Sequence, residues 1–149
     1  MSPLAPRRGN FVLLRADVLW LLLPQHEVGA VAYLEAPPEA SAVQAGVRLQ
    51  QRADGPRQLA ALSSRMTMLD AFPADRVLVT ALVGTPIAWC WSEVKVLIDT
   101  SVQPQPIPRV LHAPGMPVHE FVEHEAGIAF VVGAQALCAY AGRHGTMTR

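Results

Sequence analysis

The sequence predicts an all-β protein built from two similar β units that are followed by a short C-terminal helix. A repeated order carries this prediction, because a hairpin, a third strand, a proline segment and a second hairpin occur in each half. Short β-branched and aromatic runs separated by turn-forming residues are typical of strands. Apolar residues make up 51% of the 149 positions, enough for a shared core. We expect one domain over residues 1–149, with a first lobe over about 10–72 and a second over about 73–142.

The first unit begins with two apolar strands around the polar turn Arg15-Ala16-Asp17. In the third strand, Gly29 indicates a bulge or a close backbone approach. Pro37-Pro38 then breaks the pattern, and Asp54-Gly55 is a strong hairpin turn. The expected strands are Phe11–Leu14, Val18–Leu23, Glu27–Leu34, Val47–Arg52 and Arg57–Leu62.

The second unit repeats this order around the turns Gly84-Thr85-Pro86 and Ala126-Gly127. Between them, Gln103–Pro108 carries three prolines and is expected to be an extended strap. Strong helix formers from Ala134 to Ala141, ended by Gly142, predict the helix. The expected strands are Arg76–Leu82, Ile87–Trp91, Glu93–Ile98, Val118–His124 and Ile128–Val132.

Composition and local patterns argue against several classes of protein. A formal net charge of zero with 16% charged residues does not suit nucleic-acid binding, which needs a basic face. The longest apolar run, Val18–Leu23, is far shorter than the roughly 20 residues of a membrane-spanning helix. No signal-peptide pattern is visible, so we expect a cytoplasmic protein. Cys90 and Cys138 lack disulfide or metal spacing and are predicted to be buried, reduced thiols.

Catalytic patterns are not found in the sequence. The serines lie in no Gly-x-Ser-x-Gly elbow, and the cysteines have no accompanying histidine and acid pattern. The glycines are scattered singly and form no phosphate-binding loop. We therefore predict a protein that is not an enzyme and needs no cofactor.

Three histidines form the one cluster that could bind a metal or another ligand: His112, His119 and His124. His119 and His124 are five residues apart, which places them on opposite faces of a strand. A solvated hairpin edge is therefore favoured, and a small metal- or ligand-binding β protein stays as an alternative.

Two tryptophans, Trp89 and Trp91, share a face of one predicted strand, and Trp20 has the matching place in the first unit. Such rings either fill the core of a small barrel or form an exposed binding anchor, for example in a homodimer. The core interpretation is favoured.

The order of elements resembles the CheW-like family over nearly the whole chain. Members are two five-stranded SH3-like β-barrels packed around a shared core. They are non-enzymatic adaptors that couple chemoreceptors to a CheA-type histidine kinase. The resemblance implies an adaptor in chemotaxis or type IV pilus twitching motility, recruited in the cytoplasm to membrane receptor arrays. It rests on Phe11-Val12-Leu13-Leu14, Val28-x-x-Val31, Gly46-Val47, Arg76-Val77-Leu78-Val79, Val94-x-Val96, Pro106-x-Pro108 and Ile128 to Val132.

The resemblance also implies a partner-binding groove for the helical tip of a receptor. Apolar side chains would line the groove, and an arginine would reach polar groups of the helix. Arg48 and Arg52 are alternatives for that arginine, and both could equally be ordinary solvated strand residues. The family's Asn-Leu-Arg-Gly signature is replaced here, which leaves a degenerate CheW-like scaffold for another complex as the alternative function. The predicted groove residues are Val28, Val31, Arg48, Leu49 and Arg52.

Overall fold

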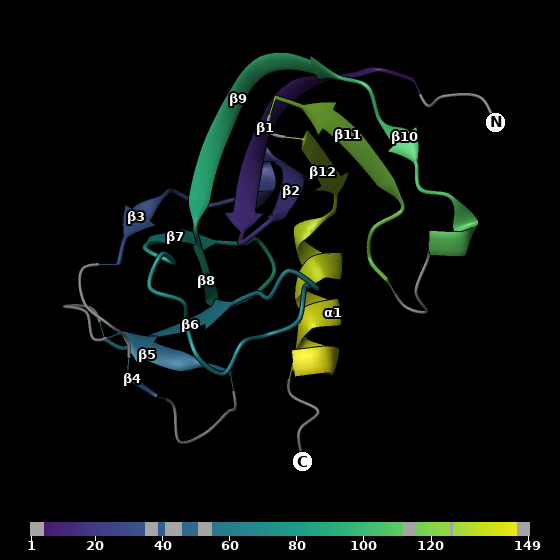
Figure 1. The fold of residues 1–149 in the computed structure, drawn as a ribbon. Helices are drawn as coiled ribbons and strands as arrows, with labels where there is room; N and C mark the ends of the chain where they lie inside the picture. Colours follow the sequence, from purple (N-terminus) through teal and green to yellow (C-terminus); the bar gives the residue numbers. More distant parts are fainter. Residues whose placement is uncertain are drawn as a thin grey trace.

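Two curled β-sheets and a C-terminal helix make up the fold (Figure 1). The structure is a computed structural model that describes residues 5–34, 39–40, 46–50, 55–111, 116–125 and 127–145. No helix within these ranges is long and apolar enough to cross a membrane.

The first sheet combines strands from both ends of the chain. Its order is β10-β11-β12-β2-β1-β9, in which β12 runs parallel to β2 and the other neighbours are antiparallel. The strands are β1 (Arg7–Ala16), β2 (Leu19–Pro24), β9 (Glu93–Val102), β10 (Gln105–Pro106), β11 (Glu120–His124) and β12 (Gly127–Val131).

The second sheet holds the middle of the chain in the order β3-β7-β8-β6-β5-β4, with β6 and β8 parallel. The short helical turns η1 (Gln25–Glu27) and η2 (Arg109–Leu111) lie outside the sheets, and α1 spans Ala134–Gly145. The strands are β3 (Ala32–Tyr33), β4 (Glu39–Ala40), β5 (Arg48–Gln50), β6 (Arg57–Ala61), β7 (Leu78–Ala81) and β8 (Ala88–Trp91).

The predicted fold class, all-β with a C-terminal helix, is confirmed. The four predicted hairpins pair as expected, namely β1 with β2, β5 with β6, β7 with β8 and β11 with β12. Each sheet has six strands where five were predicted, because the two-residue strands β10 and β4 each add to one edge. The two curled sheets are therefore close to the two expected barrels.

The sheets do not follow the predicted division at Phe72, and this is a correction. β1 and β2 pair with β9 and β12 from the second half, while β7 and β8 join the sheet that holds β3 to β6. The first hairpin is buried on both faces, since Leu13 and Leu14 are buried in different core clusters. Its edge N–H and C=O groups are therefore kept from water and need strand partners on both sides, which the second half supplies.

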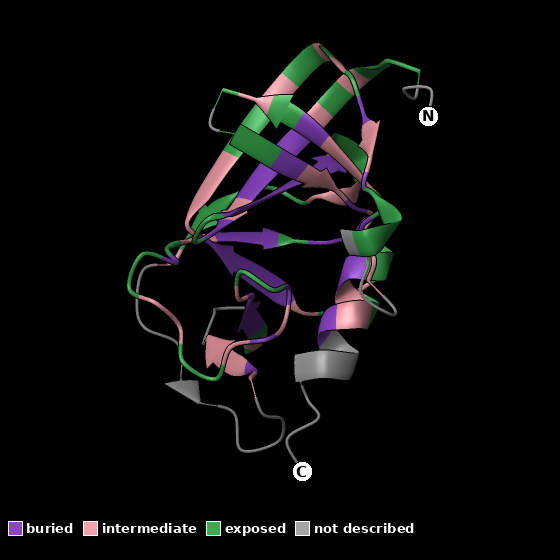
Figure 2. Cartoon of the chain, turned by 45° about the vertical axis from the view of Figure 1, so that its right-hand side comes forward, coloured by how far each residue is buried: buried purple, intermediate pink, exposed green. Residues whose placement is uncertain are grey.

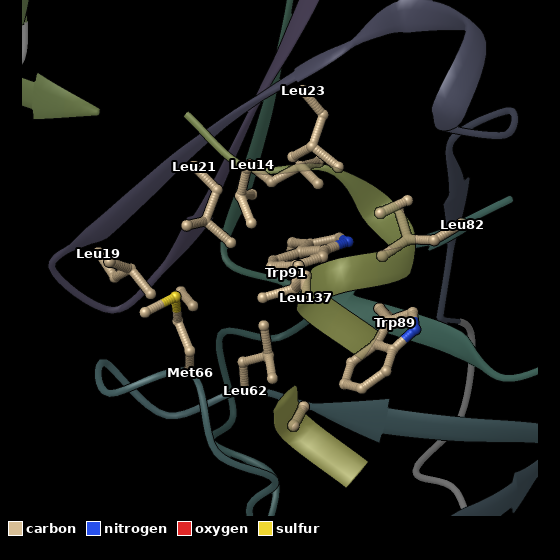
Figure 3. Close-up of a cluster of buried hydrophobic side chains, with 14 of the residues drawn as sticks. Leu14, Leu19, Leu21, Leu23, Leu62, Met66, Leu82, Trp89, Trp91 and Leu137 are labelled. Carbon is tan, nitrogen blue, oxygen red and sulfur yellow. The ribbon is translucent and has the colours of Figure 1, made fainter. Parts of the chain in front are cut away.

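The main core lies between the sheets and α1, and the strands that face each other there are mostly buried (Figure 2). Trp89, Trp91 and Leu137 of α1 meet in it (Figure 3). The indole Nε1 of Trp91 donates a hydrogen bond of 2.8 Å to Thr80 Oγ1, which satisfies its polar atom away from water. Trp89 and Trp91 are thus core residues and not an exposed anchor, so they offer no surface for a homodimer.

Two polar contacts connect the sheets and the helix. Arg76, whose side chain is fully buried just before β7, places Nη2 3.1 Å from Oδ1 of Asp17 in the turn between β1 and β2. Asp17 has φ 58, a left-handed conformation that Asp and Asn tolerate better than most residues. Glu27 of η1 accepts a hydrogen bond of 2.7 Å through Oε1 from the backbone N–H of Ala134, the first residue of α1. A free helix N–H is thereby capped by a distant side chain.

Candidate functional site

The predicted groove residues lie in two separate parts of the second sheet. Val28 and Val31 precede β3, whereas Arg48 and Leu49 belong to β5. Three strands, β7, β8 and β6, stand between β3 and β5 in the sheet. Arg52 lies outside the described residues. Strand pairing therefore does not make the two groups neighbours, and their joint role in one groove stays a prediction.

The segment that enters β3 passes from the core to the surface. Val28 forms a bridge with Leu82 and packs against the main core. At Gly29, an added Cβ would lie 3.1 Å from the Cβ of Ala81, which confirms the predicted close backbone approach. Val31 and Tyr33 are then exposed, Tyr33 to 74%. This segment offers an apolar surface next to a fixed backbone.

Arg48 is held by contacts within the chain. Its Nη2 donates a hydrogen bond of 2.7 Å to the carbonyl oxygen of Asp70, and its guanidinium carbon lies 5.4 Å from the ring centroid of Phe72. A cation over an aromatic face is attracted by the ring quadrupole. Arg48 thus connects β5 to the segment that follows β6. Its neighbour Leu49 is half-buried.

Strand β9 carries a second exposed apolar surface, which lies outside the predicted groove. Val94 packs against the main core, whereas Val96 and Ile98 are exposed, Ile98 to 62%. The alternation of Val94, Val96 and Ile98 was the available signal, since side chains two apart share a face of a strand. Neighbouring exposed apolar side chains are typical of surfaces that bind other proteins.

The histidines are not gathered into one site in the described part of the chain. His119 lines a cavity of about 320 Å³ with Glu120, and His124 lines another of about 390 Å³. The ring of His124 meets Trp20 edge to face, with centroids 5.2 Å apart. His112 lies outside the described residues, and the described residues contain no group of three or more His, Cys, Asp or Glu that could hold a metal.

Burial governs the chemistry of the two cysteines. It raises the pKa of the Cys90 thiol to about 12 and that of the Cys138 thiol to about 11. Both sulfurs are free of disulfides, and Cys90 is fully buried as predicted, whereas Cys138 is half-buried. Since the thiolate is the nucleophilic form, neither cysteine is activated at neutral pH.

Two curled sheets around a common core, with apolar side chains exposed on the segment that enters β3 and on β9, define a two-sheet β protein with apolar surfaces. The fold is similar to that of the scaffolding protein TtCheW from Thermoanaerobacter tengcongensis, with a TM-score of 0.59 and 11% sequence identity. The likeness covers 85% of this chain and 89% of that chain. No family model matches the sequence, and no curated protein matches it either.

Proposed function

We propose that this chain is a non-enzymatic adaptor of a bacterial chemosensory system, serving chemotaxis or type IV pilus twitching motility. It would couple a CheA-type histidine kinase to the cytoplasmic tips of chemoreceptors at membrane receptor arrays. One observation carries the proposal: the fold follows that of a scaffolding protein over 85% of this chain and 89% of the other.

The exposed apolar residues support a role in protein binding. Val28 and Val94 anchor two segments in the main core, and each segment then exposes apolar side chains, Val31 with Tyr33 and Val96 with Ile98. A helical receptor tip is bound mainly through a few apolar side chains that lie in such a surface. A rigid backbone beneath them lowers the entropic cost of association.

The direct test is binding of the full chain to a CheA-type kinase and to a receptor-tip fragment from the same genome, measured by calorimetry. Val31→Lys and Ile98→Lys should each weaken binding of the receptor tip at least about tenfold, since a buried contact would gain an unpaired charge. The matched control is Val18→Lys, in the exposed turn between β1 and β2, which should bind as the parent chain does. Failure to bind either partner more tightly than about 1 mM would refute the proposal.

One observation favours a second candidate, a CheW-like scaffold for another complex. Arg48, one of the two alternatives for the groove arginine, is engaged by Asp70 and Phe72. If Arg48→Ala leaves kinase and receptor binding intact, the arginine serves the fold alone. If the parent chain binds neither the kinase nor the receptor tip and instead co-purifies with a different complex in its own cells, the scaffold function replaces the chemosensory one.

A further inference from the structure

The first sheet is open on one side, between β9 and β11. β9 is the last strand of the sheet at one end, and at the other end β10 pairs with β11 through Gln105 and Pro106 at Phe121 and Glu120. Beyond these two pairs, β11 continues to His124. A cavity of about 390 Å³ lies here, lined by residues of β9, β11, β1 and β2. The two outer parts of the curled sheet, β9 and β11, can be followed in Figure 1.

The floor of this cavity is apolar. Leu13, Leu22 and Val122 belong to the smaller core inside the first sheet, and Leu97 packs against it from β9. A volume of about 390 Å³ falls within the range of roughly 300–1,000 Å³ found for small-molecule sites, which combine an apolar lining with a few polar groups. The cavity therefore suits a compact apolar group.

The mouth carries charges of both signs. Lys95 lies on the same face of β9 as Leu97, and its Nζ is 4.0 Å from Oε2 of Glu125, the outer limit of an ion pair. Glu125 is 92% exposed, so this pair is weak and both groups can accept closer partners. Burial lowers the pKa of His124 and the nearby Lys95 lowers it further, against an opposing effect of Glu125. The His124 ring is therefore held toward its neutral form, and Lys95 carries the positive charge of the mouth.

We propose that this cavity binds an apolar α-amino acid such as leucine or phenylalanine. The side chain would rest on Leu97, above the buried Leu13, Leu22 and Val122, the carboxylate would bind Lys95, and the ammonium group would bind Glu125. A simple carboxylate would leave Glu123 and Glu125 facing a like charge, and a simple amine would face Lys95. A zwitterion complements both signs at once. The proposal is independent of the adaptor function.

Calorimetry with the full chain tests the class of ligand. Leucine and phenylalanine should bind with a Kd of about 1 mM or tighter. The probes 4-methylpentanoate and 3-methylbutylamine keep the apolar group but carry one charge each, and each should bind about tenfold more weakly because one charged hydrogen bond is lost. Equal binding of leucine and either analogue, or no leucine binding at about 10 mM, would overturn the proposal.

Variants of β9 test the location. Leu97→Trp fills the cavity and should abolish leucine binding, and Lys95→Met should weaken it about tenfold. Val96→Thr alters the exposed side chain between them on the opposite face of β9, and should leave binding unchanged. If Leu97→Trp does not fold, methyl NMR of the parent chain during a leucine titration locates the binding site instead. Leucine should shift the methyl signals of Leu97 and Val122, and shifts confined to the main core would refute the site.

Discussion

For the ion pair between the buried Arg76 and the partly exposed Asp17, we predict that removing the carboxylate lowers the stability of the fold more than removing the arginine does. The Arg76 side chain is fully buried, while that of Asp17 is 44% exposed. Losing one partner of a fully buried pair costs about 3–5 kcal/mol, because the other charge stays in a poorly solvated place. Water reaches Asp17, and Oδ1 of Asp75 lies 4.0 Å from Nε of Arg76, so we expect a loss of about 2 kcal/mol for Asp17→Asn, which keeps a residue that tolerates φ 58°.

Arg76→Met removes the buried charge and fills much of its volume, so it should cost about 1 kcal/mol or less. The double variant should resemble Arg76→Met, since no buried cation then needs Asp17. Urea unfolding at pH 7 measures each free energy, with an unchanged m-value as the check that the unfolded state is comparable. The matched control is Asp99→Asn, because Asp99 also has positive φ and pairs with an arginine, Arg8, but at an exposed place. Its effect should be much smaller. The reasoning fails if Asp17→Asn is no worse than Asp99→Asn, or is milder than Arg76→Met.

Three further outcomes follow from the structure. Glu27→Ala should destabilise the protein by about 1 kcal/mol and speed amide exchange at Ala134. Glu27→Gln keeps an acceptor and should therefore destabilise the protein less. Equal losses of stability in the two variants would contradict capping by the Glu27 side chain. With their raised pKa values, Cys90 and Cys138 should react slowly with a thiol reagent at pH 8, the fully buried Cys90 more slowly than the half-buried Cys138, and both should react in urea. Rapid labelling of Cys90 in the native chain would contradict its burial. The pKa of His124 is lowered in the folded chain, so its stabilising contribution is present above the unfolded value of 6.5 and is lost as pH falls below it. The stability of His124→Asn should therefore decline less than that of the parent chain between pH 7 and pH 5, and parallel curves would count against this assignment.

Local features of the fold could be predicted from the sequence because their causes are local. The turn between β1 and β2 forms at Asp17 and Val18, next to the predicted Arg15-Ala16-Asp17, and the helix formers after Gly133 give α1, which continues to Gly145. The parallel pairs β2 with β12 and β6 with β8 join segments far apart in the chain, and no turn residue marks them. The repeat showed the order of the strands, and an order does not determine which strands pair.

The candidate site was predictable to a similar extent. Val28 packs on the core and Val31 is exposed, in keeping with a segment whose apolar residues serve both core and surface. The partner of Arg48 could not be foreseen, because the backbone oxygen of Asp70 carries no signal in the sequence. Ile98 was assigned to a strand that builds the barrel, yet beyond Val94 this face of β9 no longer meets the main core, so Val96 and Ile98 are exposed.

The crossing of strands between the two halves has a consequence for how the chain reaches its native state. β1 and β2 are the first strands to be made, yet their neighbours β9 and β12 follow only after the whole second sheet has been synthesised. Pairing over such long sequence separations slows folding and leaves apolar strands uncovered in the meantime. A nascent chain that stops at Phe72 would hold β1 with one edge open, so the N-terminal half should need its C-terminal half, or a chaperone, to stay soluble.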